Sequence, residues 1–194
     1  MRTSITTRSR WDRSGTAGIF CSQKSLGLDR GDQRQQNQDR IYAAFYNLWK
    51  NGFDGELVLI GRVWGKSGDG WLNEAYRQPR FRHLDHVPDQ ALKDELRNAR
   101  ATIYVSAVEG FGLPPIESLH AGIPVIVTDN IPSITDLPEY GQIRLKSASV
   151  PDITEAVRVT ADNQACFRLW QQADNLKLAT WRDFAFRAAA WVQA

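Results

Sequence analysis

The stretch of sequence that decides the fold is residues 109–126, EGFGLPPIESLHAGIPVI. Before it, residues 102–106 (TIYVS) make a short apolar run typical of a buried strand, and residues 124–128 (PVIVT) make a second one. Between the two runs, proline stands at the start of a segment and glycine just after its end, which predicts a short helix over residues 114–121. The order strand, loop, helix, strand is typical of a parallel sheet.

The same alternation of strands and helices continues on both sides of this stretch. Apolar residues at residues 56–61 and 81–87 predict two further strands. Apolar residues at helical spacing predict further helices over residues 39–51, 88–98, 153–161, 164–178 and 181–192. The predicted fold class is therefore α/β, a Rossmann-like parallel sheet flanked by helices.

The chain changes character near residue 37. Residues 1–36 are mostly polar, so we expect an irregular or poorly ordered N-terminal segment with one candidate strand at residues 19–22. Residues 37–194 carry the strong apolar patterns, and they are predicted to form the Rossmann-like domain.

The composition of the 194 residues is ordinary for a soluble globular protein, with 42% hydrophobic residues, 24% charged residues and a net charge of +2. So small a charge gives no reason to expect nucleic acid as a partner. Cys21 and Cys166 lie far apart without zinc-ligand spacing, and His83 and His86 fit a surface strand or loop better than a metal site. No apolar run reaches the ~20 residues that span a bilayer, and no secretory signal opens the sequence. The predicted location is the cytoplasm, with the periphery of a membrane as the alternative.

The loop at residues 109–113 has the features of an anion site. In an open parallel sheet, ligands bind beyond the carboxyl ends of the strands, and a helix start offers free N–H groups to a phosphate. Gly110 and Gly112 would let a ligand approach the main chain closely. Glu109 at the strand end and Glu117 in the first turn of the helix can point into one cleft, where carboxylates accept hydrogen bonds from sugar hydroxyls. Each residue alone also fits an ordinary turn or helix start, so the prediction rests on their order.

Residues 109–126 closely resemble the signature of the glycogen-synthase-like family of retaining glycosyltransferases (glycosyltransferase family 4-like). In that family, two glutamates separated by seven residues enclose Gly-Phe-Gly-Leu-Pro, and two Rossmann-like domains face each other across a cleft. The resemblance covers about residues 37–192 and implies the C-terminal, donor-binding half of such an enzyme.

The resemblance implies roles for individual residues. Glu109 would be the catalytic residue that contacts the transferred sugar and stabilises charge on it, and Glu117 would hold the ribose of the nucleotide. Main-chain N–H groups would bind the sugar and diphosphate, and Val87 would lie against the base. The positions implied for nucleotide-sugar binding are Gly110, Phe111, Gly112, Leu113, Glu117, Gly61, Arg62 and Val87.

The reaction implied is transfer of a hexose from a nucleotide-diphosphate sugar to a sugar or lipid-linked acceptor, with the anomeric configuration retained. No metal or other cofactor is implied, because helix dipoles and basic side chains neutralise the leaving diphosphate.

Two departures from the family bear on activity. The position of the family's phosphate-binding lysine is Gln36, and Arg34, Arg40 or Arg62 are the candidate substitutes. The family's N-terminal acceptor domain has no counterpart, because residues 1–36 are too few to form one. We therefore expect a chain that lacks the acceptor domain.

Three alternatives remain open. The chain could be a truncated or degenerate module that binds a nucleotide sugar but transfers nothing, which Gln36 favours. It could be a subunit that needs a separate acceptor-domain partner chain, or one that self-associates. It could also be an unrelated nucleotide-binding α/β protein.

Overall fold

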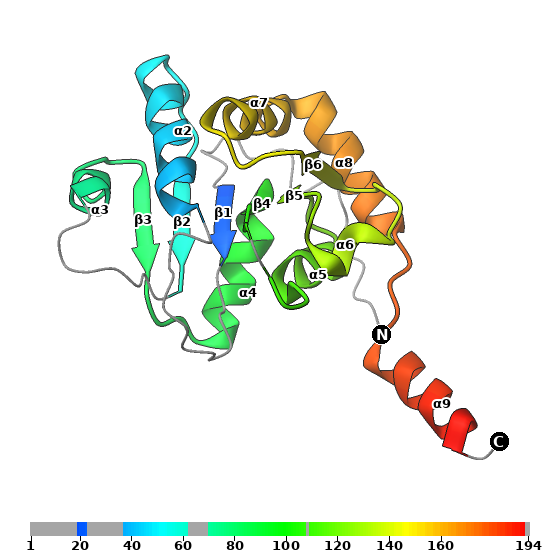
Figure 1. Cartoon of the computed structure of the whole chain (residues 1–194). Helices are drawn as coiled ribbons and strands as arrows, with labels where there is room; N and C mark the ends of the chain where they lie inside the picture. The colour runs from blue at the N-terminus through cyan, green and yellow to red at the C-terminus, as the bar shows by residue number, and fades with distance from the viewer. Residues whose placement is uncertain (1–18, 23–36, 62–69, 108, 193–194) are drawn as a thin grey trace.

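The computed structural model describes residues 19–22, 37–61, 70–107 and 109–192. In these ranges, six strands form one sheet in the order β3-β2-β1-β4-β5-β6, and every neighbouring pair is parallel (Figure 1). The strands are β1 (Ile19–Ser22), β2 (Leu57–Ile60), β3 (Phe81–Leu84), β4 (Ala101–Tyr104), β5 (Val125–Thr128) and β6 (Gln142–Leu145). The predicted α/β fold with a parallel sheet is confirmed.

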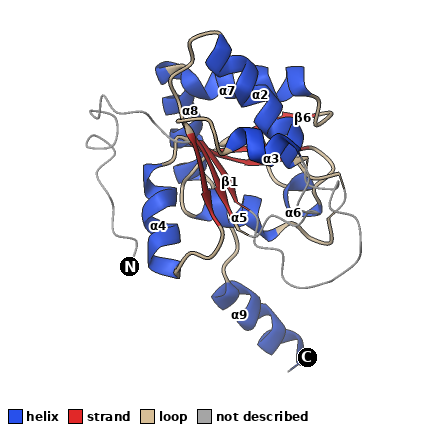
Figure 2. Ribbon diagram, turned by 90° about the vertical axis from the view of Figure 1, so that its left-hand side faces the viewer, coloured by secondary structure: helices blue, strands red, loops and turns tan. Residues whose placement is uncertain are grey.

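Helices cover both faces of this sheet. They are α2 (Gln38–Lys50), α3 (Gly70–Ala75), α4 (Asp89–Asn98), α5 (Leu113–His120), α6 (Pro132–Thr135), α7 (Val150–Ala161), α8 (Asn163–Asn175) and α9 (Trp181–Val192). α2 and α7 pack against each other over one face, α4 and α5 cover the other, and α8 contacts both α5 and α7. Figure 2 shows the sheet between these layers.

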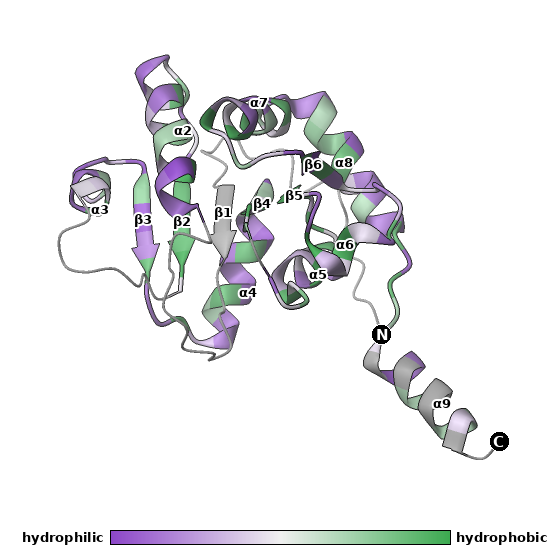
Figure 3. Cartoon of the chain, in the orientation of Figure 1, coloured by the Kyte–Doolittle hydropathy of each residue, from purple (hydrophilic) through white to green (hydrophobic). Residues whose placement is uncertain are grey.

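Alternate residues of the buried strands serve the two layers. Leu57 and Leu59 belong to the core beneath α2, whereas Val58 and Ile60 pack on the side of α4. β2 is hydrophobic along its whole length (Figure 3), and all four of its residues are buried. Burial on both faces explains the continuous apolar run by which this strand was predicted.

β1 lies in the middle of the sheet, between β2 and β4. From β1 the chain continues to β2 and β3 on one side of the sheet, and then crosses to β4, β5 and β6 on the other. The strand order therefore reverses between β1 and β4, and ligands of such sheets bind at the carboxyl ends of the strands at that point. The candidate strand at residues 19–22 is thus present and belongs to the same sheet as the later strands. Most of residues 1–36 lies outside the described ranges, so a domain boundary after residue 36 remains a prediction.

The sequence patterns did not identify β6 or α6. β6 reads QIRL and forms one edge of the sheet, where Ile143 and Arg144 are only half-buried, so no apolar run marks it. α6 reads PSIT and makes a single turn, which is too short to show a periodicity.

α9 extends away from the other helices in both Figure 1 and Figure 2. Two of its aromatic side chains are largely exposed, Phe186 at 65% and Trp191 at 82%. Within the described ranges, no helix combines the length and the apolar character needed to cross a membrane.

Candidate functional site

The loop between β4 and α5 lies at the carboxyl edge of the sheet, beside the point where the strand order reverses (Figure 1). Gly112 is the N-cap of α5, and its φ of +81° and ψ of 65° are left-handed values that favour glycine. A Cβ on Gly112 would lie only 2.4 Å from Cγ2 of Ile131. The loop therefore needs glycine at residue 112 for both its backbone conformation and its close packing. The predicted position of this loop at the carboxyl edge is confirmed.

The prediction that Glu117 lies in the first turn of α5 is wrong. The helix begins at Leu113, ahead of the two prolines, and its first turn holds no acidic residue. Proline is tolerated throughout the first turn, whose N–H groups have no partner within the helix, so the prolines do not fix which residue of that turn comes first. Glu117 therefore lies in the second turn, where stabilising the helix dipole is a weaker explanation for a carboxylate, since that effect is confined to the first turn.

Both glutamates lack a partner among the described residues. No hydrogen bond or ion pair joins the carboxylate of Glu109 or of Glu117 to a residue of these ranges, although Glu109 is half-buried. The loop between them is open on its outer side, because Phe111 is 57% exposed and Leu113 is 40% exposed. A Cβ on Gly110 would meet nothing within 4 Å. A ligand therefore has room to approach the main chain here.

The exit of β2 provides a second part of the carboxyl edge. Gly61, with a φ of +107°, follows β2, and its carbonyl oxygen lies 2.9 Å from Nε2 of His83. Because a carbonyl only accepts hydrogen bonds, Nε2 of His83 is the donor. Nδ1 of the same ring lies 2.7 Å from the hydroxyl of Tyr76. These contacts occupy both ring nitrogens of His83.

The remaining predicted site residues fall in different places. Val87 is half-buried and packs against Val58 and Ile60 in the core beside α4, so it also has a structural role. Arg62, like Arg34 and Gln36, lies outside the described residues. Arg40, the third candidate to replace the family's lysine, is exposed on α2 and donates a hydrogen bond to the carbonyl of Ala148 at 3.3 Å.

Asn37 is a site-forming residue that the sequence patterns did not single out. It is the only non-glycine residue of the described ranges with a positive φ (50°), a conformation that asparagine tolerates. Its buried side chain donates from Nδ2 to the carbonyl oxygen of Val105 at 2.8 Å. This bond ties the start of α2 to the exit of β4. An asparagine directly before a predicted helix was the one available signal.

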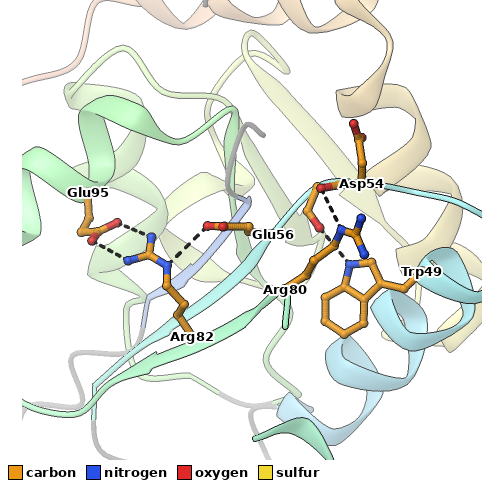
Figure 4. A network of polar contacts seen from close by, with 7 residues as sticks. Trp49, Asp54, Glu56, Arg80, Arg82 and Glu95 are labelled. Atoms are coloured by element: carbon orange, nitrogen blue, oxygen red, sulfur yellow. Dashed lines mark hydrogen bonds and ion pairs between the residues drawn. The ribbon is translucent and has the colours of Figure 1, made fainter. Parts of the chain in front are cut away.

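A polar network on the β2–β3 side of the sheet is structural (Figure 4). Arg82 of β3 donates two hydrogen bonds of 3.0 Å to Glu95 of α4 and lies 3.3 Å from Glu56, which precedes β2. The hydrogen bonds to Glu95 raise the pKa of the Arg82 guanidinium. Arg80 donates to the carbonyl of Asp54 at 3.3 Å. These contacts fasten the edge strand to its neighbours.

Comparison with protein families gives a match over most of the chain. A family model described as "Glycosyl transferases group 1" matches residues 31–164. A serotype-specific mannosyltransferase of Escherichia coli (WbdA) is 28% identical over 152 residues, which cover 74% of this chain and 18% of that protein. The O-antigen chain mannosyltransferase B of Escherichia coli is 33% identical over 94 residues, 48% of this chain and 20% of that protein. The chain thus spans about a fifth of the length of these relatives.

Solved structures show the same fold. The C-terminal domain of a glycosyl transferase group 1 family protein (LpcC) from Francisella tularensis has a TM-score of 0.66 at 16% identity, and the match covers 88% of this chain and 90% of that one. Sucrose-phosphate synthase from Thermosynechococcus elongatus has a TM-score of 0.65 at 19% identity, covering 91% of this chain and 44% of that one. The fold is therefore that of one half of a two-domain glycosyltransferase, as the sequence predicted.

Proposed function

Because the chain belongs to the glycosyl transferases group 1 family, we propose that its carboxyl-edge loop binds a nucleotide-diphosphate sugar for the retaining transfer of a hexose. The observation that carries this proposal is the arrangement of the β4–α5 loop. Its glycines are exposed or left-handed, and its helix start lies at the strand-order reversal. Glu109 in the loop and Glu117 in the second turn of α5 have no partner among the described residues.

Each part of the loop has a role in this proposal. Glu117 accepts hydrogen bonds from the ribose hydroxyls, for which a carboxylate is well suited. The N–H groups of residues 110–113 bind the sugar and the diphosphate at the start of α5. The half-buried carboxylate of Glu109 contacts the sugar and stabilises positive charge that develops on it. Gly61, Arg62 and Val87 complete the nucleotide side of the site.

The relatives suggest which sugar to test first. Two of them are named mannosyltransferases, so mannose is the first hexose we propose. The acceptor is proposed to be a sugar or a lipid-linked sugar, held by a second Rossmann-like domain that faces this one. Gln36 in place of a lysine favours a second candidate function, a module that binds the donor without transferring it. Loss of a cation at the leaving diphosphate costs roughly 3 kcal/mol of transition-state stabilisation.

Calorimetric titration of the chain with mannose and glucose donors carrying uridine, guanosine or adenosine diphosphate tests the proposal. We expect weak, saturable binding of one nucleotide together with its sugar. Absence of binding for every donor would overturn the proposal. A transfer assay of the same chain separates the two candidate functions, because the module is expected to bind without turnover, whereas measurable transfer would exclude it.

A further inference from the structure

We propose that residues 128–133, which run from the end of β5 into α6, and Ser133 of α6 above all, position the β4–α5 loop so that two of its N–H groups face the ligand. This inference rests on the proposed function, in which the loop receives the diphosphate and sugar of the donor. It assigns a positioning role to residues that follow the neighbouring strand and that touch none of the predicted ligand contacts except through the main chain of the loop.

Four carbonyl groups of the loop accept hydrogen bonds from residues 128–133. The bonds are Thr128 Oγ1 to Ser106 at 2.9 Å, Asn130 Nδ2 to Ala107 at 2.8 Å, Ser133 N to Phe111 at 2.9 Å and Ser133 Oγ to Gly112 at 2.6 Å. Ser133 therefore supplies two of the four bonds, and both go to the part of the loop that precedes α5.

The bonds from Ser133 fix the direction of the adjacent N–H groups. In a trans peptide, the carbonyl of one residue and the N–H of the next point in opposite directions, and the described ranges contain no cis peptide. When the carbonyls of Phe111 and Gly112 point to Ser133, the N–H groups of Gly112 and Leu113 point away from it. Neither N–H has a hydrogen-bond acceptor among the described residues. Two neighbouring donors without acceptors among the described residues suit the oxygens of a diphosphate.

The segment that supplies these bonds is anchored in the core. Ile131 and Ile134, on either side of Ser133, are fully buried, and Ser133 itself is 7% exposed. Close packing adds to the hydrogen bonds, because no side chain larger than hydrogen fits between Gly112 and Ile131. The inner side of the loop is thus fixed while its outer side is exposed at Phe111 and Leu113. Donors that are fixed before the ligand arrives need no reorganisation when it binds.

The test compares Ser133→Ala with Thr160→Val. Thr160 is the matched control: its fully buried hydroxyl also donates to a backbone carbonyl, that of Val157 at 2.8 Å, but it lies on α7 at the other face of the sheet. For both variants, three quantities are measured: the free energy of unfolding, the NMR order parameters of the N–H groups of Gly112 and Leu113 in the free protein, and the Kd for a nucleoside diphosphate well below the unfolding temperature.

Both variants are expected to lose stability. Only Ser133→Ala is expected to lower the order parameter of the Leu113 N–H and to raise the Kd, the latter by roughly tenfold. Alanine keeps the backbone N–H of residue 133 and its bond to Phe111, so the N–H of Gly112 should keep its order parameter and is the internal reference. Equal order parameters of Leu113 in the two variants would overturn the inference, since Ser133 would then contribute to stability alone. A lower order parameter without a change in Kd would also overturn it. If the wild-type chain binds no nucleotide, the proposed function fails, and an unchanged order parameter in Ser133→Ala still decides against the positioning of the loop, while a lower one supports it.

Discussion

Two exits at the carboxyl edge of the sheet, after β4 and after β2, are held in place in different ways. After β4, several carbonyls of the loop accept hydrogen bonds from Thr128, Asn130 and Ser133, all in one neighbouring segment. After β2, the carbonyl of Gly61 accepts from one side chain of the described residues, that of His83 on the edge strand β3.

The residues that hold the two exits differ in how deeply they are buried. The segment that holds the β4 exit is anchored by fully buried isoleucines, whereas His83 is only half-buried and its partner Tyr76 is 55% exposed. Local stability follows burial, so the first exit should open rarely and the second more often. We therefore expect a rigid surface for the diphosphate and sugar beside a more adaptable surface for the rest of the nucleotide.

The largest effect should come from Gly112→Ala, which attacks the rigid exit directly. The variant forces a left-handed conformation on alanine and places its Cβ 2.4 Å from Ile131. We expect a loss of roughly 2–4 kcal/mol in the free energy of unfolding, from strain and overpacking together. Chemical denaturation measures it.

Gly52→Ala is the control for Gly112→Ala. Gly52 has a similar φ of +86°, but a Cβ there would meet nothing within 4 Å. Gly52→Ala should lower the free energy of unfolding only through backbone strain, by roughly 1–2 kcal/mol. Equal losses in the two variants would show that the loop does not pack as tightly as the comparison requires.

The next effect concerns the outer surface of the rigid exit, at Glu117. Glu117→Ala should weaken binding of a nucleoside diphosphate by roughly 1–3 kcal/mol, the scale for losing a charged hydrogen-bond acceptor. Calorimetry measures the change. Glu155→Ala, which removes an exposed carboxylate from α7, is the control and should leave the Kd unchanged. If Glu117→Ala kept the wild-type Kd, the proposal that Glu117 binds the ribose would be wrong.

The sequence predicted the parts of this comparison that leave a local signal. Apolar runs marked β2, β4 and β5, and the spacing of Glu109 and Glu117 marked the loop between them. The contacts that fix the loop leave no local signal in the sequence. Ser133 lies 21 residues from Gly112, and Asn37 lies 68 residues from Val105. A serine that donates to a distant carbonyl looks in sequence like any other serine, so only the fold reveals such pairs.

The start of α5 was predicted wrongly because the local sequence signals there disagree. The adjacent prolines placed the helix start at residue 114, whereas Gly112 is the N-cap of α5, so the helix begins at Leu113 and Glu117 lies in its second turn. The edge strand β6 was not predicted either. A strand at the sheet edge needs few apolar residues, so the sequence of β6 shows no apolar run.

His83→Ala tests the adaptable exit. Loss of the bond from Nε2 to Gly61 should cost roughly 0.5–1.5 kcal/mol of stability. His83→Ala should change the affinity for a nucleoside diphosphate but not for pyrophosphate, because in the proposed site pyrophosphate contacts only the β4–α5 loop. His86→Ala is the control, since His86 is exposed and pairs with Asp85 at the surface. A parallel loss of pyrophosphate binding in His83→Ala would mean that the two exits are not independent.

The smallest effect on nucleotide binding is expected at Glu109. This variant separates the two roles proposed for the rigid exit, binding of the nucleotide and binding of the sugar. The proposed partner of Glu109 is the sugar, so Glu109→Ala should leave the Kd of the nucleoside diphosphate unchanged within about twofold. The same variant should bind the complete nucleotide sugar more weakly, because the carboxylate no longer accepts hydrogen bonds from the sugar hydroxyls. The measurement is the ratio of the two Kd values, for the wild type and for Glu109→Ala. Glu117→Ala provides the contrast, because losing a contact to the ribose should weaken both ligands equally and leave that ratio unchanged. If Glu109→Ala weakened both ligands to the same degree, its carboxylate would serve the nucleotide or the loop itself, and the assignment of Glu109 to the sugar would be wrong.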